Sequence, residues 1–240
     1  MREIRLSGSE GGGGELNRPS LPLYGMGMVY DKAYYETQYR NYERQNPARK
    51  IAFYRRLAEN AAGETMRPRI LDIGCAFGHF LASLPAHWER CGIDASQYAV
   101  GRASRIMPEI QFAVGDWEQR PFGGFFDLIT AFDVLEHIES LPDLFDWVMR
   151  SLRVGGAFVF VVPVYDGPTG PIIRFLDRDP THVHRKPRSF WLECGGAGLH
   201  LTEWWGIFRY CLPGGHYIHA VTRRWRHWCP AIACVLRRRE

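Results

Sequence analysis

The chain of 240 residues has little of what marks membrane, secreted or metal-ribbon proteins. Its best apolar run, Ala157 to Val164, is interrupted by Pro163 and falls well short of the roughly 20 residues that a membrane helix needs. The N-terminal segment has no apolar signal-peptide core. The six cysteines include no CxxC pair, so a disulfide framework is not indicated. We therefore expect a cytoplasmic protein with reduced thiols and no membrane span.

Composition and charge favour one globular domain. The sequence has 46% apolar and 23% charged residues, close to the globular average, and its length suits a single core. The formal net charge of +4 comes largely from arginines between Arg223 and Arg239. Such a run is normally a solvated surface, and it forms no recognisable groove-binding motif. This argues against nucleic acid as a partner.

The sequence divides into a leader, a folded domain and a tail. Residues 1–29, with their Ser/Gly run, are predicted to be a flexible leader, and residues 225–240 a basic C-terminal tail. The domain then spans residues 30–224. Within it, residues 30–62 have the periodicity of a helical cap that breaks at its Asn-Pro dipeptide. Residues 165–188, rich in Pro, Asp, Gly and His, are predicted to be an inserted lid.

Between cap and lid, short apolar runs alternate with helical stretches. Runs of this kind are typical of strands buried on both faces of a parallel sheet. They are Ile70 to Cys75, Arg90 to Asp94, Ile110 to Val114, Phe126 to Ala131 and Ala157 to Val162. Two later strands, Leu199 to Trp204 and Tyr217 to Thr222, complete the sheet. We predict an α/β fold with a doubly wound, mostly parallel, seven-stranded Rossmann-like sheet.

The strongest motif is RILDIGCAFGHF, in which a buried strand ends at Asp72, turns through Gly74 to Gly78 and opens a helix. Glycine lets the backbone pass close to a ligand, and the helix start offers N–H groups. The nicotinamide fingerprint GxGxxG is not matched, because Ala76 occupies the second glycine position. An NAD-dependent oxidoreductase is therefore the weaker alternative.

The next three strands also end in polar or aromatic residues. Asp94, in CGIDAS, can accept the two hydroxyls of a ribose. Asp116 can accept the adenine amino group, with Trp117 beside the base. The fourth strand leads into FDVLEHI. Because parallel strands end at one edge of the sheet, these side chains should face the same crevice.

These motifs resemble the class I S-adenosylmethionine-dependent methyltransferases over roughly residues 30–222. The matching elements are ILDIGCAFG, GIDAS, VGDWE, FFDLITAFDVLEHI and LRVGGAFVFVVP. The resemblance implies S-adenosylmethionine as donor and S-adenosylhomocysteine as product. It places Asp72 and Gly74 near the methionine moiety, Asp94 on the ribose, and Asp116 with Trp117 on adenine. The full expected set of donor-binding residues is Asp72, Gly74, Cys75, Ala76, Gly78, Asp94, Ala95, Asp116, Trp117, Phe132 and Asp133.

Later segments indicate the acceptor. The phrase DPTHVHRKPRSFW resembles the D-x-T-H segment of a subgroup that includes ubiquinone-type and natural-product O-methyltransferases, where it lies over the acceptor pocket. Aromatic residues of the cap and late segments suggest a largely apolar pocket. The residues expected to contact the acceptor are Tyr34, Tyr35, Tyr39 and Trp191. The resemblance thus implies a small-molecule partner.

Methyl transfer depends chiefly on in-line positioning, which can contribute roughly 7 to 11 kcal/mol. A hydroxyl acceptor also needs a base, and histidine suits that role near neutral pH. His182 is the first candidate and His137 the second, although His182 could instead anchor the loop and His137 could be structural. His182, His184, Asp177 and Asp179 have no diagnostic ligand spacing, which argues against a metal.

The resulting hypothesis is methyl transfer to a small, aromatic or apolar acceptor, at oxygen. Two alternatives stay open in the same chemistry: methylation of a peptide, and methylation of carbon or nitrogen in a natural product. A third, from another class, is a scaffold protein that binds the donor without turnover.

Overall fold

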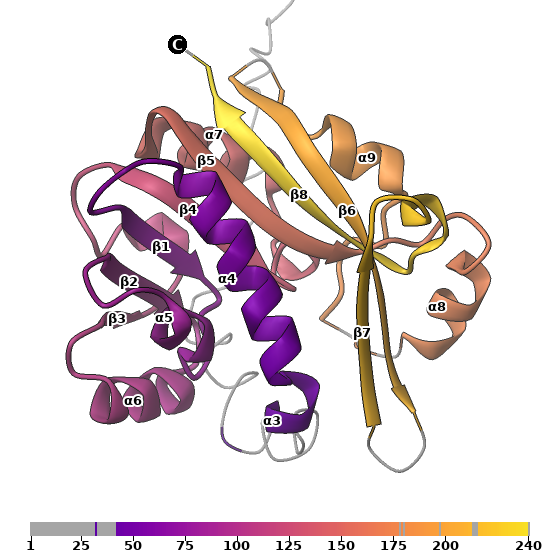
Figure 1. Cartoon of the computed structure of the whole chain (residues 1–240), viewed down its shortest axis with the longest axis horizontal. Helices are drawn as coiled ribbons and strands as arrows, with labels where there is room; N and C mark the ends of the chain where they lie inside the picture. Colours follow the sequence, from indigo (N-terminus) through magenta and orange to yellow (C-terminus); the bar gives the residue numbers. More distant parts are fainter. Residues whose placement is uncertain are drawn as a thin grey trace, which may run out of the picture.

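The computed structural model describes residues 32, 42–177, 179, 181–196, 198–212 and 216–239. Eight strands form one sheet in the order β3-β2-β1-β4-β5-β8-β6-β7 (Figure 1). The strands are β1 (Arg69–Ile73), β2 (Glu89–Asp94), β3 (Gln111–Val114), β4 (Phe126–Phe132), β5 (Leu152–Pro163), β6 (Leu199–Leu212), β7 (His216–Thr222) and β8 (Ala231–Arg238).

The first five strands pair in parallel, whereas β8 is antiparallel to both β5 and β6, and β7 is antiparallel to β6. The predicted α/β class with a mostly parallel sheet is therefore confirmed. The sheet has eight strands instead of the predicted seven, because an additional strand lies between β5 and β6.

That additional strand, β8, lies in residues 225–240, which the sequence assigned to a basic tail. Its first six residues, Ala231 to Leu236, are buried. Two of its arginines satisfy backbone carbonyls: Arg237 donates to those of Gly155 and Ala61, and Arg238 donates to that of Leu152. The tail interpretation was wrong for this stretch because the arginines that follow the apolar run masked a strand pattern.

Helices cover both faces of the sheet (Figure 1). Helices α4 and α5 pack on one face and α7 and α9 on the other. The α-helices are α3 (Tyr42–Gln45), α4 (Ala48–Ala62), α5 (His79–Ser83), α6 (Gln97–Ile106), α7 (Leu141–Ser151), α8 (Gly170–Leu176) and α9 (Arg188–Glu193). The 3-10 turns are η1 (Trp117–Gln119), η2 (Leu135–His137) and η3 (Arg226–Trp228). Among the described residues, none of the helices could span a bilayer.

The described part of the predicted cap consists of α3 and α4. The break lies at Asn46 and Pro47, as the sequence predicted, with Pro47 at the N-cap of α4. Asn46 closes the turn, because its side-chain amide donates to the carbonyl of Tyr42 at 2.9 Å. The expected acceptor residues Tyr34, Tyr35 and Tyr39 lie outside the described residues.

The predicted lid, residues 165–188, contains α8 and an extended segment. This segment is fixed by its backbone: the amides of Val183 and His184 both donate to the carbonyl of Glu136, at 2.9 and 3.1 Å. The amide of Tyr165 donates to the carbonyl of Lys186. The lid is thus docked against the turn that follows β4.

We expect Leu236→Ala, in β8, to lower the free energy of unfolding by about 2 to 5 kcal/mol, because it opens a cavity at a side chain that is 1% exposed. The matched control is Leu176→Ala, at a leucine that is 57% exposed, which should change stability by less than about 0.5 kcal/mol. Urea unfolding followed by circular dichroism measures both. Equal midpoints for the two variants would contradict a core position for β8.

Candidate functional site

The ends of four parallel strands meet at one edge of the sheet. Ile73 of β1 pairs with Ile93 of β2 on one side and with Ala131 of β4 on the other. Asp94 pairs with Val114 of β3. The loops that follow these strands therefore start side by side, as the sequence predicted.

The turn after β1 has three residues with positive φ: Gly74 at 72°, Ala76 at 45° and Gly78 at 73°. The amide of Gly74 donates to the carbonyl of Ile93 at 2.8 Å. A Cβ on Gly74 would lie 2.2 Å from Cγ2 of Val134, in the loop after β4, so this position of the turn requires glycine. The turn is compact, and Ala76 holds a conformation that costs an L-residue roughly 1 to 2 kcal/mol.

Asp94 connects this turn to the next loop. Its Oδ2 accepts from the amide of Ala76 and its Oδ1 from the amide of Ser96, both at 2.8 Å. Ser96 in turn caps α6 by accepting from the amide of Ala99. Burial raises the pKa of Asp94, although the two amide donors oppose that shift. Each carboxylate oxygen still has a second lone pair for a ligand hydroxyl.

Asp72 and Cys75 lie beneath the turn. Asp72 is buried, and its Oδ1 accepts from the Thr130 hydroxyl at 2.7 Å. Burial raises its pKa to about 7, against the effect of that hydrogen bond. Cys75 is also buried, and its amide donates to Ile93 like that of Gly74. The side chains of Asp72 and Cys75 are thus buried, whereas Ala95, which follows Asp94, is partly exposed.

The third strand delivers Asp116 and Trp117. Asp116 caps η1, because its Oδ1 accepts from the amide of Glu118 at 3.0 Å. Trp117 is 9% exposed, and its ring packs against Trp147 of α7 with the centroids 5.8 Å apart. The tryptophan therefore belongs to the core on the α7 face, with Asp116 at the adjoining edge.

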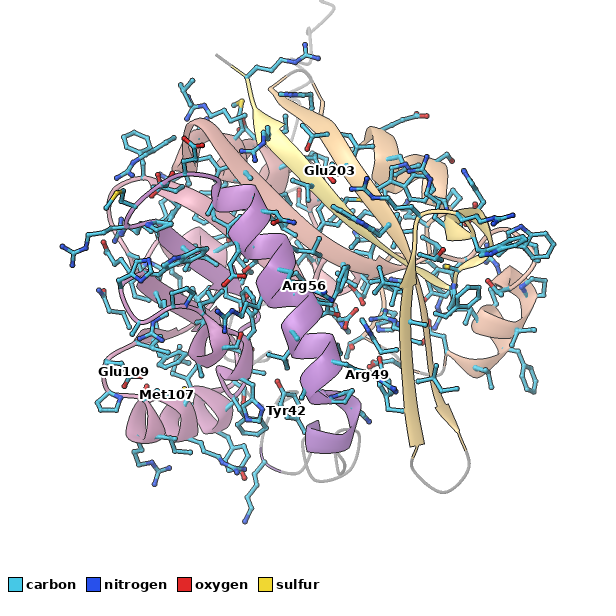
Figure 2. The ribbon with its side chains drawn as sticks, viewed as in Figure 1. Tyr42, Arg49, Arg56, Met107, Glu109 and Glu203 are labelled. Carbon is cyan, nitrogen blue, oxygen red and sulfur yellow. The ribbon has the colours of Figure 1, made fainter. Side chains whose placement is uncertain are left out.

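Tyr42 of α3 was not among the expected site residues. Its ring meets Phe77 of the glycine turn edge-on, with centroids 4.9 Å apart, and His79 at 5.4 Å. Burial and the nearby carboxylates of Asp94 and Asp72 raise its pKa. Figure 2 shows Tyr42 below the N-terminal end of α4. Tyr42 thus brings the cap into contact with the glycine turn. In the sequence, the signal that could have identified it was an aromatic residue shortly before the Asn-Pro break.

The end of β4 joins an aromatic stack to a charged cluster. Phe132 stacks on Tyr54 of α4 at a centroid distance of 4.1 Å, and Phe80 meets it edge-on. Asp133, with φ of 60°, forms ion pairs with Arg209 of β6 and Lys50 of α4. These two cations lower its pKa, against the effect of burial. The sequence predicted Phe132 and Asp133 as site residues but not Tyr54, Lys50 or Arg209.

The two candidate bases lie side by side. The rings of His137 and His182 meet at 61°, with centroids 4.7 Å apart. The Thr181 hydroxyl donates to Asp179 at 2.6 Å, so it can accept from Nδ1 of His137 at 2.9 Å. Burial and the neighbouring His182 lower the pKa of His137. The D-x-T-H segment therefore orients both rings.

His182 has a carboxylate partner. Its Nδ1 lies 2.9 Å from Oδ2 of Asp177 and 3.2 Å from the Tyr165 hydroxyl, which also donates to that carboxylate. Burial alone would raise the pKa of Asp177, but the hydrogen bonds from Tyr165 and His182 lower it to about 2. Donation from Nδ1 to this anion leaves Nε2 to accept a proton. His184 instead pairs with the carbonyl of Ile138.

Glu136 is a site residue that the sequence did not single out, although it precedes His137. It is 1% exposed, and its Oε2 has no hydrogen-bond partner. Burial and the charge of Asp133 raise its pKa to about 8. Glu136, His137 and His182 each offer one atom that could bind a metal ion, and these three atoms lie within 4.8 Å of one another. Among the described residues this is where a cation could be held or a proton moved.

Trp191, expected to contact the acceptor, is fully buried. It lies in α9 and packs against Phe160 and Phe190, with centroid distances of 6.2 and 5.1 Å. Its ring belongs to the core between α9 and the sheet.

With this geometry established, comparison with known proteins decides the family. The profile of a family described as "Methyltransferase domain" matches residues 40–234. The chain belongs to this methyltransferase family. The resemblance to class I S-adenosylmethionine-dependent methyltransferases is thereby confirmed, while the subgroup stays a prediction.

Relatives of this methyltransferase differ in their named reactions. It is 29% identical over 101 residues to a sterol 24-C-methyltransferase of Gibberella zeae, covering 38% of this chain and 26% of the relative. It is 28% identical over 115 residues to a malonyl-[acyl-carrier protein] O-methyltransferase of Paenibacillus, covering 43% and 42%. The matched segments thus span less than half the length of these relatives.

A solved structure shares the fold. The N-methyltransferase NodS of Bradyrhizobium japonicum, in complex with S-adenosyl-L-homocysteine, superposes with a TM-score of 0.54 at 20% identity. The match covers 80% of this chain and 88% of NodS. The C-, O- and N-methyltransferases among these relatives leave the acceptor atom to be argued from the site.

Two substitutions in the glycine turn should have opposite effects. Ala76→Gly should raise the free energy of unfolding by about 0.5 to 1 kcal/mol, because it relieves a left-handed alanine. Gly78→Ala should lower it by about 1 to 2 kcal/mol. At Gly78 the new Cβ would also lie 2.7 Å from Cζ of Phe112. Thermal unfolding of both variants tests this, and a destabilised Ala76→Gly would refute strain at Ala76.

Proposed function

We propose that the chain transfers a methyl group from S-adenosylmethionine to the oxygen of a small, largely apolar acceptor. The observation that carries this is the joint arrangement of the glycine turn with Asp94 at one side of the sheet edge, and of His182 with its carboxylate partner at the other.

The residues present fit the donor. Gly74 and Gly78 place no side chain at their positions in the turn, and the Asp94 carboxylate has lone pairs left for the two ribose hydroxyls. Tyr42 would cover the turn from the cap. The bound donor supplies an electrophilic methyl carbon on a positively charged sulfur. Asp116 is the proposed partner of the adenine amino group.

His182 is the proposed base. Its Nε2 would take the proton from the acceptor hydroxyl while the oxygen lone pair forms the new O–C bond. The C–S bond breaks and its electron pair stays on sulfur, which leaves S-adenosylhomocysteine. The Asp177 anion at Nδ1 would stabilise the imidazolium that forms. His137, held by Thr181, is the second candidate for the same proton.

Oxygen is favoured over nitrogen because of this dyad. A neutral amine attacks without prior loss of a proton, so it does not need a histidine oriented by a buried carboxylate. A hydroxyl gains most from such a base. The aromatic stack of Phe132 with Tyr54 and Phe80 supports an apolar acceptor.

Replacing Asp94 by Ala should weaken binding of S-adenosylhomocysteine by about 100-fold or more, because two hydrogen bonds to a charged group are lost. Isothermal titration calorimetry measures the change, and the melting temperature checks that the fold persists. Asp143→Ala, at an exposed carboxylate on α7, is the control and should bind like the wild type. Unchanged affinity in the Asp94 variant would remove the ribose assignment.

His182→Gln should lower single-turnover methyl transfer by about 10² to 10⁴ with saturating donor. His184→Gln is the matched control, because this histidine lies in the same segment but pairs with a backbone carbonyl. The acceptor for this assay comes from incubating the wild type with donor and a panel of small phenols and hydroxy acids, followed by mass spectrometry. Equal rates in both variants would exclude a base at His182, and no methylated product at all would favour a non-catalytic donor-binding protein.

A further inference from the structure

A buried charged cluster at the end of β4 has more positive than negative groups. Nζ of Lys50 lies 3.6 Å from Oδ2 of Asp133, and the Arg209 guanidinium pairs with the other oxygen of that carboxylate. The side chains of Lys50 and Arg209 are 8% and 17% exposed. A buried lysine and a partly buried arginine thus share one carboxylate, which is expensive unless a further anion is supplied.

Two neutral polar atoms next to this cluster have no partner. They are the Tyr54 hydroxyl, on a residue 3% exposed, and Nε2 of His219, on a residue 8% exposed. Nζ of Lys50 lies 5.6 Å from the Tyr54 ring, and the rings of Tyr54 and His219 are 6.2 Å apart. Unpaired buried polar atoms are rare in native proteins, and the Tyr54 hydroxyl, a donor beside two basic side chains, calls for an acceptor group.

At neutral pH the groups beside the two basic side chains add no further negative charge, and burial lowers the pKa of Lys50, a shift that Asp133 opposes. Burial, followed by Lys50 and Arg209, lowers the pKa of His219 to about 4, so its ring is neutral. Glu136, with its pKa raised to about 8 by burial, is mostly protonated. Asp133 is then the ionised carboxylate facing the two cations.

The position of the cluster separates it from the proposed donor site. Most of the expected donor residues follow β1, β2 and β3, whereas the cluster is built around the end of β4 with β6, β7 and α4. It includes Asp133, which the sequence analysis had placed with the donor. It adjoins the candidate bases, because Asp133 and Glu136 belong to the same turn as His137. Arg49 of α4 extends toward β7 and donates to the Tyr217 carbonyl (Figure 2).

We infer that Lys50, Tyr54, Arg209 and His219 form a subsite for a carboxylate carried by the methyl acceptor. The inference rests on the proposed function and narrows its substrate class from apolar molecules in general to apolar acids. The acceptor's carboxylate would accept hydrogen bonds from the Lys50 ammonium and the Tyr54 hydroxyl. It would balance the positive charge of the cluster and give the Tyr54 hydroxyl a partner. Phe132 and Tyr54 would hold the apolar part, and the reacting oxygen would face His182.

The first test uses simple acids as probes. Wild-type protein is titrated with sodium benzoate, cinnamate and octanoate, and separately with the matching amides, with and without saturating S-adenosylhomocysteine, while the melting temperature is followed. We expect at least one acid to raise the melting temperature while its amide does not. If none of the acids does so in either condition, the inference fails.

Variants then locate the effect. Lys50→Met removes the cation at similar length, and Tyr54→Phe removes one oxygen that bonds to nothing in the protein, so the second variant is expected to fold even if the first does not. We expect each to weaken acid binding at least tenfold. The control is Arg56→Met, on the exposed side of α4 (Figure 2), which should bind acids like the wild type. Unchanged acid binding in Tyr54→Phe and Lys50→Met would overturn the assignment.

A last comparison distinguishes the acceptor from the donor as the source of the carboxylate. If the cluster held the donor carboxylate, Lys50→Met would weaken S-adenosylhomocysteine binding but not that of 5′-methylthioadenosine, which lacks the amino-acid group, and the inference would be wrong. We expect each of the two nucleosides to bind the Lys50→Met variant as tightly as it binds the wild type. If the wild type bound neither nucleoside, the proposed function would fail, while the acid titration without nucleoside would still report on the subsite.

Discussion

The Asp94 carboxylate is the interaction on which the geometry of the sheet edge depends. By accepting from the amides of Ala76 and Ser96, it joins the turn after β1 to the start of α6. Two amide donors at 2.8 Å hold this partly buried carboxylate in place, and the left-handed Ala76 persists because its bond to Asp94 offsets the strain. In the proposed function the same group also recognises the ribose, so shape and recognition depend on one residue.

On the other side of the edge, backbone bonds position the catalytic candidates. The amides of Val183 and His184 share the Glu136 carbonyl, which brings the lid segment across the turn after β4. His182 then falls opposite His137, and the carboxylates of Asp177 and Asp179 orient the two rings from the lid side.

Much of the fold followed from local pattern. Runs buried on both faces predicted β1 to β5, and the Asn-Pro dipeptide predicted the boundary between α3 and α4. The pattern failed at β8, because apolar residues followed by arginines resemble a solvated tail. In the structure this segment pairs with β5 and β6, and its arginines donate to backbone carbonyls of other elements. The flexible leader at residues 1–29 and the acceptor contacts of Tyr34, Tyr35 and Tyr39 stay predictions.

The sequence by itself determined the family and the glycine turn with its acid, because these residues lie within a few positions of strand ends and their spacing is visible along the chain. The tertiary structure decided what surrounds the acceptor. Lys50, Asp133 and Arg209 are separated by more than 70 residues at each step and meet only when α4 and β6 pack beside β4. Likewise, the His137–His182 pair exists only because the lid docks on Glu136. Long-range contacts of this kind have no period or motif, since they depend on which surfaces pack together.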